Sequence, residues 1–106
     1  MKKIKLSDSG ARGWFIGDFP EAVFHTKDFE VNYKIKEKRQ AESHIHKIVT
    51  EIQLVISGKM LVSGEIFEAG DICILEPGDI SQIEYLETTA TVAVKAPSIP
   101  SDKYLL

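Results

Sequence analysis

Two histidines and one glutamate are the residues of this chain whose types and spacing best suit chemistry. His44 and His46 are separated by one residue, so on a β-strand both imidazoles project from the same face. Glu51 follows a short turn, and on an antiparallel neighbouring strand its carboxylate can return to that face. Two neutral nitrogens and one anionic oxygen form a facial triad that suits iron, manganese, nickel or zinc. The spacing therefore predicts a site for one divalent metal ion.

Other residue types with chemical potential have less specific surroundings. Gln53 shares the face of Glu51 on a regular strand, where its amide could orient Glu51 or bind a substrate oxygen. His25 follows Phe24 at a polar turn and is expected on the surface. Trp14 could stack on a flat ligand, but beside Phe15 it is expected in a core or an interface. Cys73 lies among aliphatic residues and is expected to be a small buried side chain.

The elements that must position these residues have an apolar period of two. Phe29, Val31, Tyr33 and Ile35 alternate with polar residues, which predicts a strand with one buried apolar face. Further strands are predicted over 52–56, 60–62, 66–67, 72–75, 80–86 and 89–95. Hairpin signals at Ser57-Gly58-Lys59 and Ser63-Gly64 separate three of them, and no window has convincing helical spacing. The chain is thus predicted to be all-β, a sandwich or a barrel that a jelly roll can close.

The length of 106 residues allows one domain with one core. Residues 1–28 are expected to complete the barrel with strands and loops, and residues 29–96 are expected to form its core. The polar segment 37–43 is predicted to be a loop at the mouth of the site. Pro97 and Pro100 cannot continue a central strand, so residues 97–106 are predicted to be a C-terminal tail along the surface.

Charge and composition make several partners improbable. The formal net charge is -3, which offers no general attraction for nucleic acid or anionic membranes. The basic clusters 2–5 and 34–39 are expected to be solvated surface. No long apolar run follows the first lysines, and a lone cysteine fits a reducing compartment, so a cytoplasmic location is expected.

The string HIHKIVTEIQLVISG, residues 44–58, resembles the first motif of the cupin superfamily, HxH(x)3-4E(x)6G. GDICILEPGDISQIEY, residues 70–85, resembles the second motif at Gly70 and Gly78. The resemblance covers about residues 29–96 and implies a small cupin of the RmlC-like superfamily. Such a protein is a jelly-roll β-barrel, also called a double-stranded β-helix, with His44, His46 and Glu51 as metal ligands.

The departures from these motifs affect the number of protein ligands that a metal ion would have. The second-motif histidine falls at Ser81 and its asparagine at Tyr85, while Lys38 replaces the glycine that opens the first motif. Many metal cupins use three histidines and one glutamate, so a fourth protein ligand is missing here. Ser81, Gln82, Gln53 or a water molecule could complete the shell.

Three functions are compatible with this resemblance. The first is a metal-dependent enzyme that acts on a small molecule. The second is a metal-free sugar-nucleotide isomerase or epimerase, in which His44 and His46 transfer protons while Tyr33 and Arg39 contact the substrate. The third is a non-catalytic protein that binds a small molecule. The sequence does not choose among reactions or substrates.

A second aliphatic row predicts the oligomeric state. Ile52, Leu54 and Ile56 alternate with Glu51, Gln53 and Val55, so both faces of this strand need cover. A barrel interior covers only one face. The other is expected to pack against the N-terminal segment or a second subunit, and the cupin resemblance implies a homodimer that pairs sheet to sheet.

Overall fold

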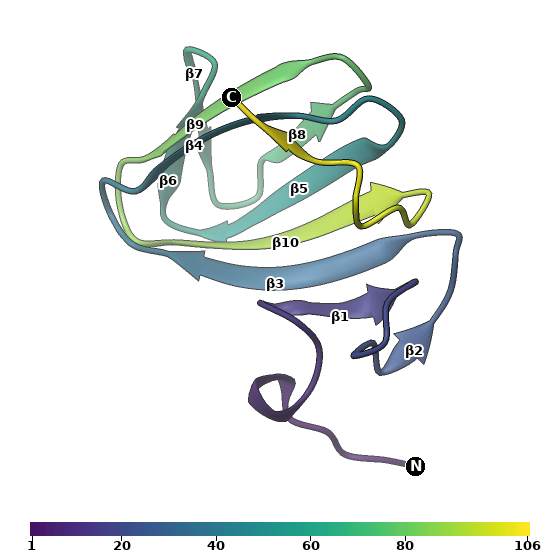
Figure 1. Cartoon of the computed structure of the whole chain (residues 1–106). Helices are drawn as coiled ribbons and strands as arrows, with labels where there is room; N and C mark the ends of the chain where they lie inside the picture. The colour runs from purple at the N-terminus through teal and green to yellow at the C-terminus, as the bar shows by residue number, and fades with distance from the viewer.

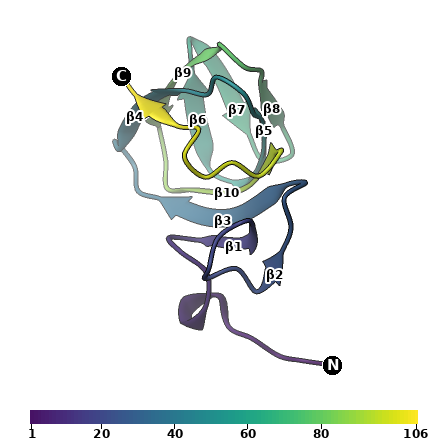
Figure 2. The same cartoon turned by 45° about the vertical axis from the view of Figure 1, so that its right-hand side comes forward.

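The computed structural model describes residues 1–106 as two facing β-sheets that close into a barrel (Figures 1 and 2). A single 3-10 turn, η1 (Leu6–Asp8), precedes the strands. The strands are β1 (Trp14–Gly17), β2 (Phe24–His25), β3 (Glu30–Lys36), β4 (Ala41–Ile45), β5 (Thr50–Ser57), β6 (Lys59–Val62), β7 (Glu65–Glu68), β8 (Ile72–Leu75), β9 (Ile80–Tyr85), β10 (Thr89–Ala96) and β11 (Tyr104–Leu105).

The two sheets have the strand orders β2-β1-β3-β10-β5-β8 and β11-β4-β9-β6-β7. Chain neighbours such as β4 and β5 therefore lie in opposite sheets, which is typical of a jelly roll. The predicted all-β jelly-roll fold is confirmed. β1 and β2 extend the larger sheet beyond β3, and the chain before them runs away from the barrel in both views (Figures 1 and 2). The structure contains no helix long and apolar enough to cross a membrane.

One of the two predicted hairpins is wrong. β5 pairs with β10 and β8, whereas β6 pairs with β7 and β9, so the turn at Gly58 passes from one sheet to the other. Ser63-Gly64 does join a hairpin, in which Val62 lies opposite Glu65. Local turn residues show where the chain reverses, but they do not show whether the next strand joins the same sheet.

The prediction for the faces of β3 is also wrong, because its polar side is the buried one. Glu30 is 2% exposed and Ile35 is 57% exposed. Glu30 forms an ion pair with Lys95 at 2.9 Å, and Asn32 Oδ1 accepts a hydrogen bond from the backbone N–H of Ala93. Polar side chains can occupy a barrel interior when they are paired in this way. The interior at this end is therefore polar, and the apolar alternation of β3 faces outward.

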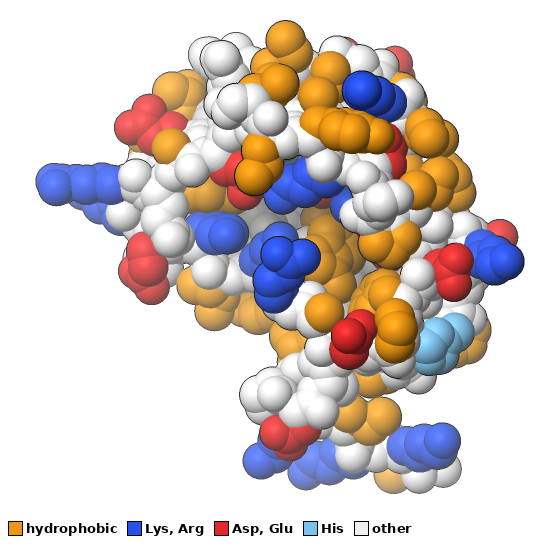
Figure 3. Space-filling model, in the orientation of Figure 1, with side chains coloured by type: hydrophobic (Ala, Val, Ile, Leu, Met, Phe, Trp, Pro, Cys, Tyr) orange, Lys and Arg blue, Asp and Glu red, His pale blue; other side chains and the backbone are white.

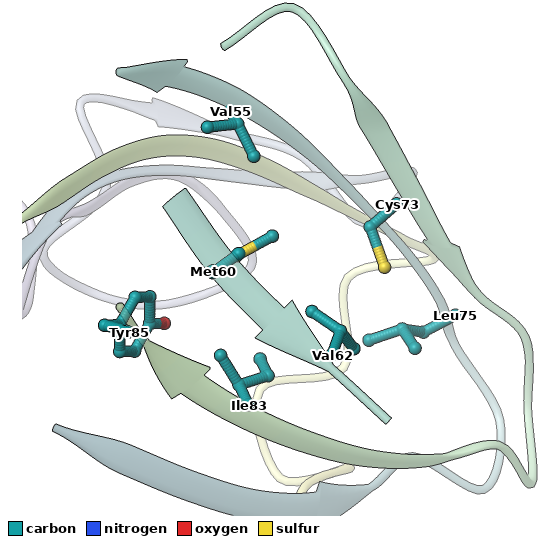
Figure 4. Close-up of a cluster of buried hydrophobic side chains, with 7 residues drawn as sticks. All are labelled: Val55, Met60, Val62, Cys73, Leu75, Ile83 and Tyr85. Atoms are coloured by element: carbon teal, nitrogen blue, oxygen red, sulfur yellow. The ribbon is translucent and has the colours of Figure 1, made fainter. Parts of the chain in front are cut away.

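The apolar core occupies the other part of the barrel (Figure 4). Along the inward face of β5, Glu51 and Gln53 are followed by Val55, so the interior changes from polar to apolar along one strand. Burial raises the pKa of Cys73 to about 11, which agrees with the structural role expected for this thiol. The cluster comprises Val55, Met60, Val62, Cys73, Leu75, Ile83 and Tyr85.

Two predicted irregular segments contain strands. β4 begins at Ala41, so the expected loop at the mouth shrinks to 37–40, and Glu42 pairs with Ile83 of β9. The segment expected to run along the surface contains β11, which pairs with β4, and Asp102, which is only 1% exposed. Backbone pairing with β9 and β11 outweighs the weak strand preference of these polar stretches.

The turn at Gly58 yields a test of the jelly-roll crossover. At φ +88°, a Cβ on Gly58 would lie 2.3 Å from the carbonyl oxygen of Thr88, whereas at Gly64, with φ +89°, nothing lies within 4 Å. Gly64→Ala should lower the free energy of unfolding by about 1–2 kcal/mol through backbone strain alone. Gly58→Ala should cost a further 1–3 kcal/mol, roughly, through the clash. Urea denaturation measures both, and equal losses would contradict the crossover packing.

The outer face of the larger sheet exposes a continuous aliphatic surface. Its members on β5 and β8 are Ile52, Leu54, Ile56, Ile72 and Ile74, each of which is substantially exposed. An apolar patch of this kind on a soluble protein is typical of an interface. The expectation of a homodimer therefore has a defined surface.

Ile52 and Ile74 lie opposite each other across β5 and β8, so they offer a direct test of this surface. If the expected homodimer forms through this face, the double variant Ile52→Lys, Ile74→Lys should raise its dissociation constant at least about a hundredfold, because burial would leave the new charges unpaired. Ile66→Lys, at an exposed isoleucine on β7 of the other sheet, is the control. Sedimentation velocity measures the oligomeric state. A double variant that dimerises as the wild type does would exclude this face as the dimer interface.

Candidate metal centre

His44, His46 and Glu51 meet in the barrel interior from opposite sheets. His44 lies in β4, His46 directly follows it, and Glu51 lies in β5. The three residues are 3%, 3% and 5% exposed. The expectation that Glu51 returns on an antiparallel neighbour of the histidine strand is wrong, since β4 pairs only with β9 and β11. The carboxylate reaches the histidines because the two sheets face each other across the interior.

The geometry of the three side chains converges on one point. His44 Nε2 and His46 Nε2 each lie 3.4 Å from Glu51 Oε1. The candidate ligand atoms all lie within 4.8 Å of one another. Gln53 Nε2 donates a hydrogen bond to Glu51 Oε1 at 3.1 Å, so the amide orients the carboxylate. The three side chains thus meet across the interior from two facing sheets, whereas the sequence analysis expected them on one face.

The outer nitrogen of each imidazole contacts an oxygen. His44 Nδ1 lies 2.9 Å from Glu42 Oε1, and His46 Nδ1 donates to the backbone carbonyl of Asp102. Because a backbone carbonyl can only accept, the proton of a neutral His46 ring lies on Nδ1. His44 has a carboxylate oxygen near each ring nitrogen, and its contact with Glu42 is not an aligned hydrogen bond. Both Nε2 atoms lie toward Glu51 Oε1. In most metal-ligating histidines the ring nitrogen that does not bind the metal likewise contacts a carboxylate or carbonyl oxygen.

A divalent cation fits this set of donors. When neither Nε2 carries a proton, two nitrogen lone pairs and a carboxylate oxygen repel one another unless a positive charge lies between them. His46 Nε2 is buried and has no hydrogen bond. Ser81 Oγ is also buried without a partner, and Ser81 lies opposite His44 in the β4–β9 register. A bound cation, or a proton shared among these side chains, would give these two atoms a partner.

The carboxylates of the site are held in their charged form. Burial alone raises the pKa of Glu51, but its contacts with His44 and His46 outweigh burial and hold this pKa well below its usual range. Contact with His44 lowers the pKa of Glu42, and Lys103, 2.7 Å away, lowers it further. Burial lowers the pKa of His44, yet its contacts with Glu42 and Glu51 raise it overall. An added cation would compete with a proton on His44.

Asp102 holds the corner between the two ligand strands. Its carboxylate accepts backbone N–H groups from Lys47 at 3.1 Å and from Ile48 and Val49 at 2.8 Å each. The same residue holds the ring of His46 through its carbonyl. Sequence reasoning missed this role, because no local pattern connects Asp102 with a turn more than fifty residues earlier.

A cavity of about 1010 Å³ is lined by His44 and Glu51. Of the predicted pocket residues, Gln53 contributes to its wall and Ser81 is buried beside His44. Tyr33 borders the cavity, but it belongs to the outward side of β3 and also borders an outer apolar pocket with Phe15 and Val23. Arg39 and Gln82 do not line it, which corrects their prediction. Gln82 projects from the outward face of β9, and Arg39 lies in the exposed turn before β4.

Several cavity residues were missed by the sequence reasoning. Lys34 and Lys36 project from the inward face of β3, so half of the basic cluster expected to be solvated lines the cavity. Trp14 lies on the wall, with Lys95 Nζ 4.5 Å from its ring centroid. Tyr85 is buried there, and burial raises its pKa to about 12. Knowing that the polar side of β3 faces inward would have placed Lys34 and Lys36 in the cavity.

Comparison with known proteins places the fold. The sequence matches no protein-family model and no curated protein. A Klebsiella pneumoniae protein with a double-stranded β-helix domain is 28% identical, with 78% of each chain covered and a TM-score of 0.69. A cupin from Bacteroides fragilis is 22% identical over 68% of each chain, with a TM-score of 0.58. The DMSP lyase DddQ from Ruegeria pomeroyi is 14% identical, with 97% of this chain and 59% of that chain covered and a TM-score of 0.72.

Asp102→Ala should lower the free energy of unfolding by about 2–4 kcal/mol, because the N–H groups of the corner, including that of the fully buried Val49, lose their acceptor. Asp102→Asn keeps one acceptor oxygen and should lose less. Asp28→Ala, at an exposed carboxylate, is the control. Equilibrium urea denaturation measures all three, and an Asp102→Ala loss no larger than the control would contradict this role.

The pH dependence follows from the same carboxylate. Burial raises the pKa of Asp102, but the hydrogen bonds from Val49, Ile48 and Lys47 lower it overall. A lowered folded-state pKa gives stability that is present above the unfolded value of about 3.9 and is lost as pH falls toward the folded value. The stability gap between the wild type and Asp102→Asn should therefore shrink below about pH 4. A gap independent of pH would contradict this assignment.

Proposed function

Since this chain is a small cupin domain, we propose that it binds one divalent metal ion through His44 Nε2, His46 Nε2 and Glu51. The observation that carries this proposal is the convergence of the two Nε2 atoms on Glu51. Each imidazole has an oxygen beside its outer nitrogen and turns its inner nitrogen toward one carboxylate oxygen. Buried donors arranged in this way favour a cation between them.

The donor set suits iron, manganese, nickel or zinc. A divalent ion bound there would supply a Lewis acid for a ligand oxygen, and with iron or manganese a redox centre. The chain's own residues prepare the site: Glu42 and the Asp102 carbonyl orient the two rings, and Gln53 orients Glu51. The histidine of the second cupin motif is Ser81 here, so three protein ligands leave positions open toward the cavity. Open positions favour a metal-dependent enzyme that acts on a small molecule.

The metal-free isomerase alternative has weaker support. The arginine assigned to its substrate, Arg39, lies in the exposed turn and does not line the cavity. The two histidines also face the same carboxylate, whereas a proton-transfer pair needs at least one imidazole nitrogen directed at the substrate. A non-catalytic binding protein would use the same cavity and differs from the enzyme only in turnover.

Elemental analysis of untagged protein tests the metal proposal. The wild type should carry about one divalent ion per chain after loading and gel filtration, and the double variant His44→Ala, His46→Ala should carry less than about a tenth of that amount. His25→Ala is the matched control, because His25 is exposed on β2. Circular dichroism shows whether the double variant folds. A folded double variant with the wild-type metal content would refute the ligand assignment, and a metal-free wild type after loading would refute metal binding.

A further inference from the structure

The walls of the cavity carry more positive than negative charge, although the chain as a whole has a net charge of -3. Figure 3 shows Lys and Arg side chains around a hollow on one face of the molecule. Glu42 and Glu51 are the carboxylates among the lining residues. The lining cations are Arg12, Lys34, Lys36, Lys95 and Lys103.

Two of these cations already have carboxylate partners. Lys95 is buried and lies 2.9 Å from Glu30 Oε1, and Lys103 lies 2.7 Å from Glu42 Oε1. Arg12, Lys34 and Lys36 form no ion pair in the structure. The positive charge at the mouth of the cavity is therefore not balanced by the protein.

Lys34 is the most constrained of the three unpaired cations. It lies on the inward side of β3, opposite Thr91 of β10, and is half-buried. Its Nζ lies 5.4 Å from the ring centroid of Trp14. Burial, and then repulsion from Lys103 and Lys36, outweigh the attraction of Glu42 and Glu51 and lower the pKa of Lys34 to about 8. A partly desolvated ammonium group among like charges is stabilised when an anion binds beside it.

We propose that Lys34, with Lys36 and Arg12, forms an anion subsite at the mouth of the cavity, so that the ligand of this protein is a small organic oxyanion. The ligand carries a carboxylate or a phosphate group, whose oxygens accept hydrogen bonds from ammonium and guanidinium groups. The inference rests on the proposed function only in taking the cavity lined by His44 and Glu51 as the ligand site.

The volume of the cavity indicates how large the bound anion is. About 1010 Å³ is at the upper end of the range for small-molecule sites and leaves room for more than an inorganic ion. Lys34 lies opposite Thr91, and Thr91 lies opposite Val55, which is four residues beyond Glu51 on β5. The subsite and the triad therefore occupy different levels of one cavity. A molecule that contacts both the anion subsite and the triad needs an anionic group at one end and a second polar group at the end near Glu51.

The test is an NMR titration of the metal-free protein with succinate, inorganic phosphate and succinamide. Succinamide matches succinate in size but has no charge. Succinate or phosphate should shift the amide resonances of β3 and β10 and bind at least about tenfold more tightly than succinamide. Tighter binding of succinate identifies a carboxylate ligand, and tighter binding of phosphate identifies a phosphorylated one. Equal binding of succinamide and both anions, or no binding at all, overturns the subsite.

Three variants separate the subsite from the general charge of the protein. Lys34→Gln should weaken anion binding about tenfold, whereas Lys34→Arg should stay within about threefold of the wild type. Lys38→Gln removes the same charge from an exposed position outside the cavity and should change binding less than twofold. An equal loss in Lys34→Gln and Lys38→Gln overturns the proposal.

A fourth variant separates this inference from the metal proposal. The double variant His44→Ala, His46→Ala should lose metal and still bind the anion in metal-free form. Anion binding that survives in a wild type unable to take up metal would refute the metal proposal alone. Metal uptake without charge-selective binding would refute the subsite alone.

Discussion

The structure depends on the burial of one carboxylate, that of Glu51, between two imidazoles. Removing a carboxylate from water is costly, so every neighbour of Glu51 must offer positive charge, a hydrogen-bond donor or a bound cation. Gln53 donates to it, and both histidine rings turn their inner nitrogens toward it. The rings in turn need acceptors on their outer side. Glu42 and the carbonyl of Asp102 supply these acceptors from strand β4 and from the segment before β11.

This requirement explains why Asp102 is buried although most of the residues around it near the C-terminus are exposed. The chain must turn from β4 to β5 within a few residues, since each strand carries part of the triad in a different sheet. The turn leaves several backbone N–H groups without partners inside the barrel, and Asp102 accepts three of them. One residue thus satisfies the backbone of the corner and holds the ring of His46.

Strand alternation divides the barrel into regions with different tasks. On β5 the inward side chains change from Glu51 and Gln53 to Val55, so one strand lines both the polar cavity and the apolar core. The outward side chains of the same strand are aliphatic and exposed. On β3 the inward side chains are polar, which brings Lys34 and Lys36 into the cavity. The acidic net charge of the chain therefore hides a cationic interior surface, because the fold segregates charges that are mixed along the sequence.

The sequence by itself determined the all-β fold, most of the strands and the three candidate ligands. Alternation and turn residues are local properties, and His44, His46 and Glu51 lie within eight positions of one another. Only the tertiary structure decided which face of β3 is buried, that Gly58 marks a crossing between sheets, and that Arg39 and Gln82 lie outside the cavity. It also decided the positions of Lys34, Glu42 and Asp102. These depend on which distant strands meet, and pairing between sheets is set by the total burial of apolar area and of paired polar groups, which no short segment encodes.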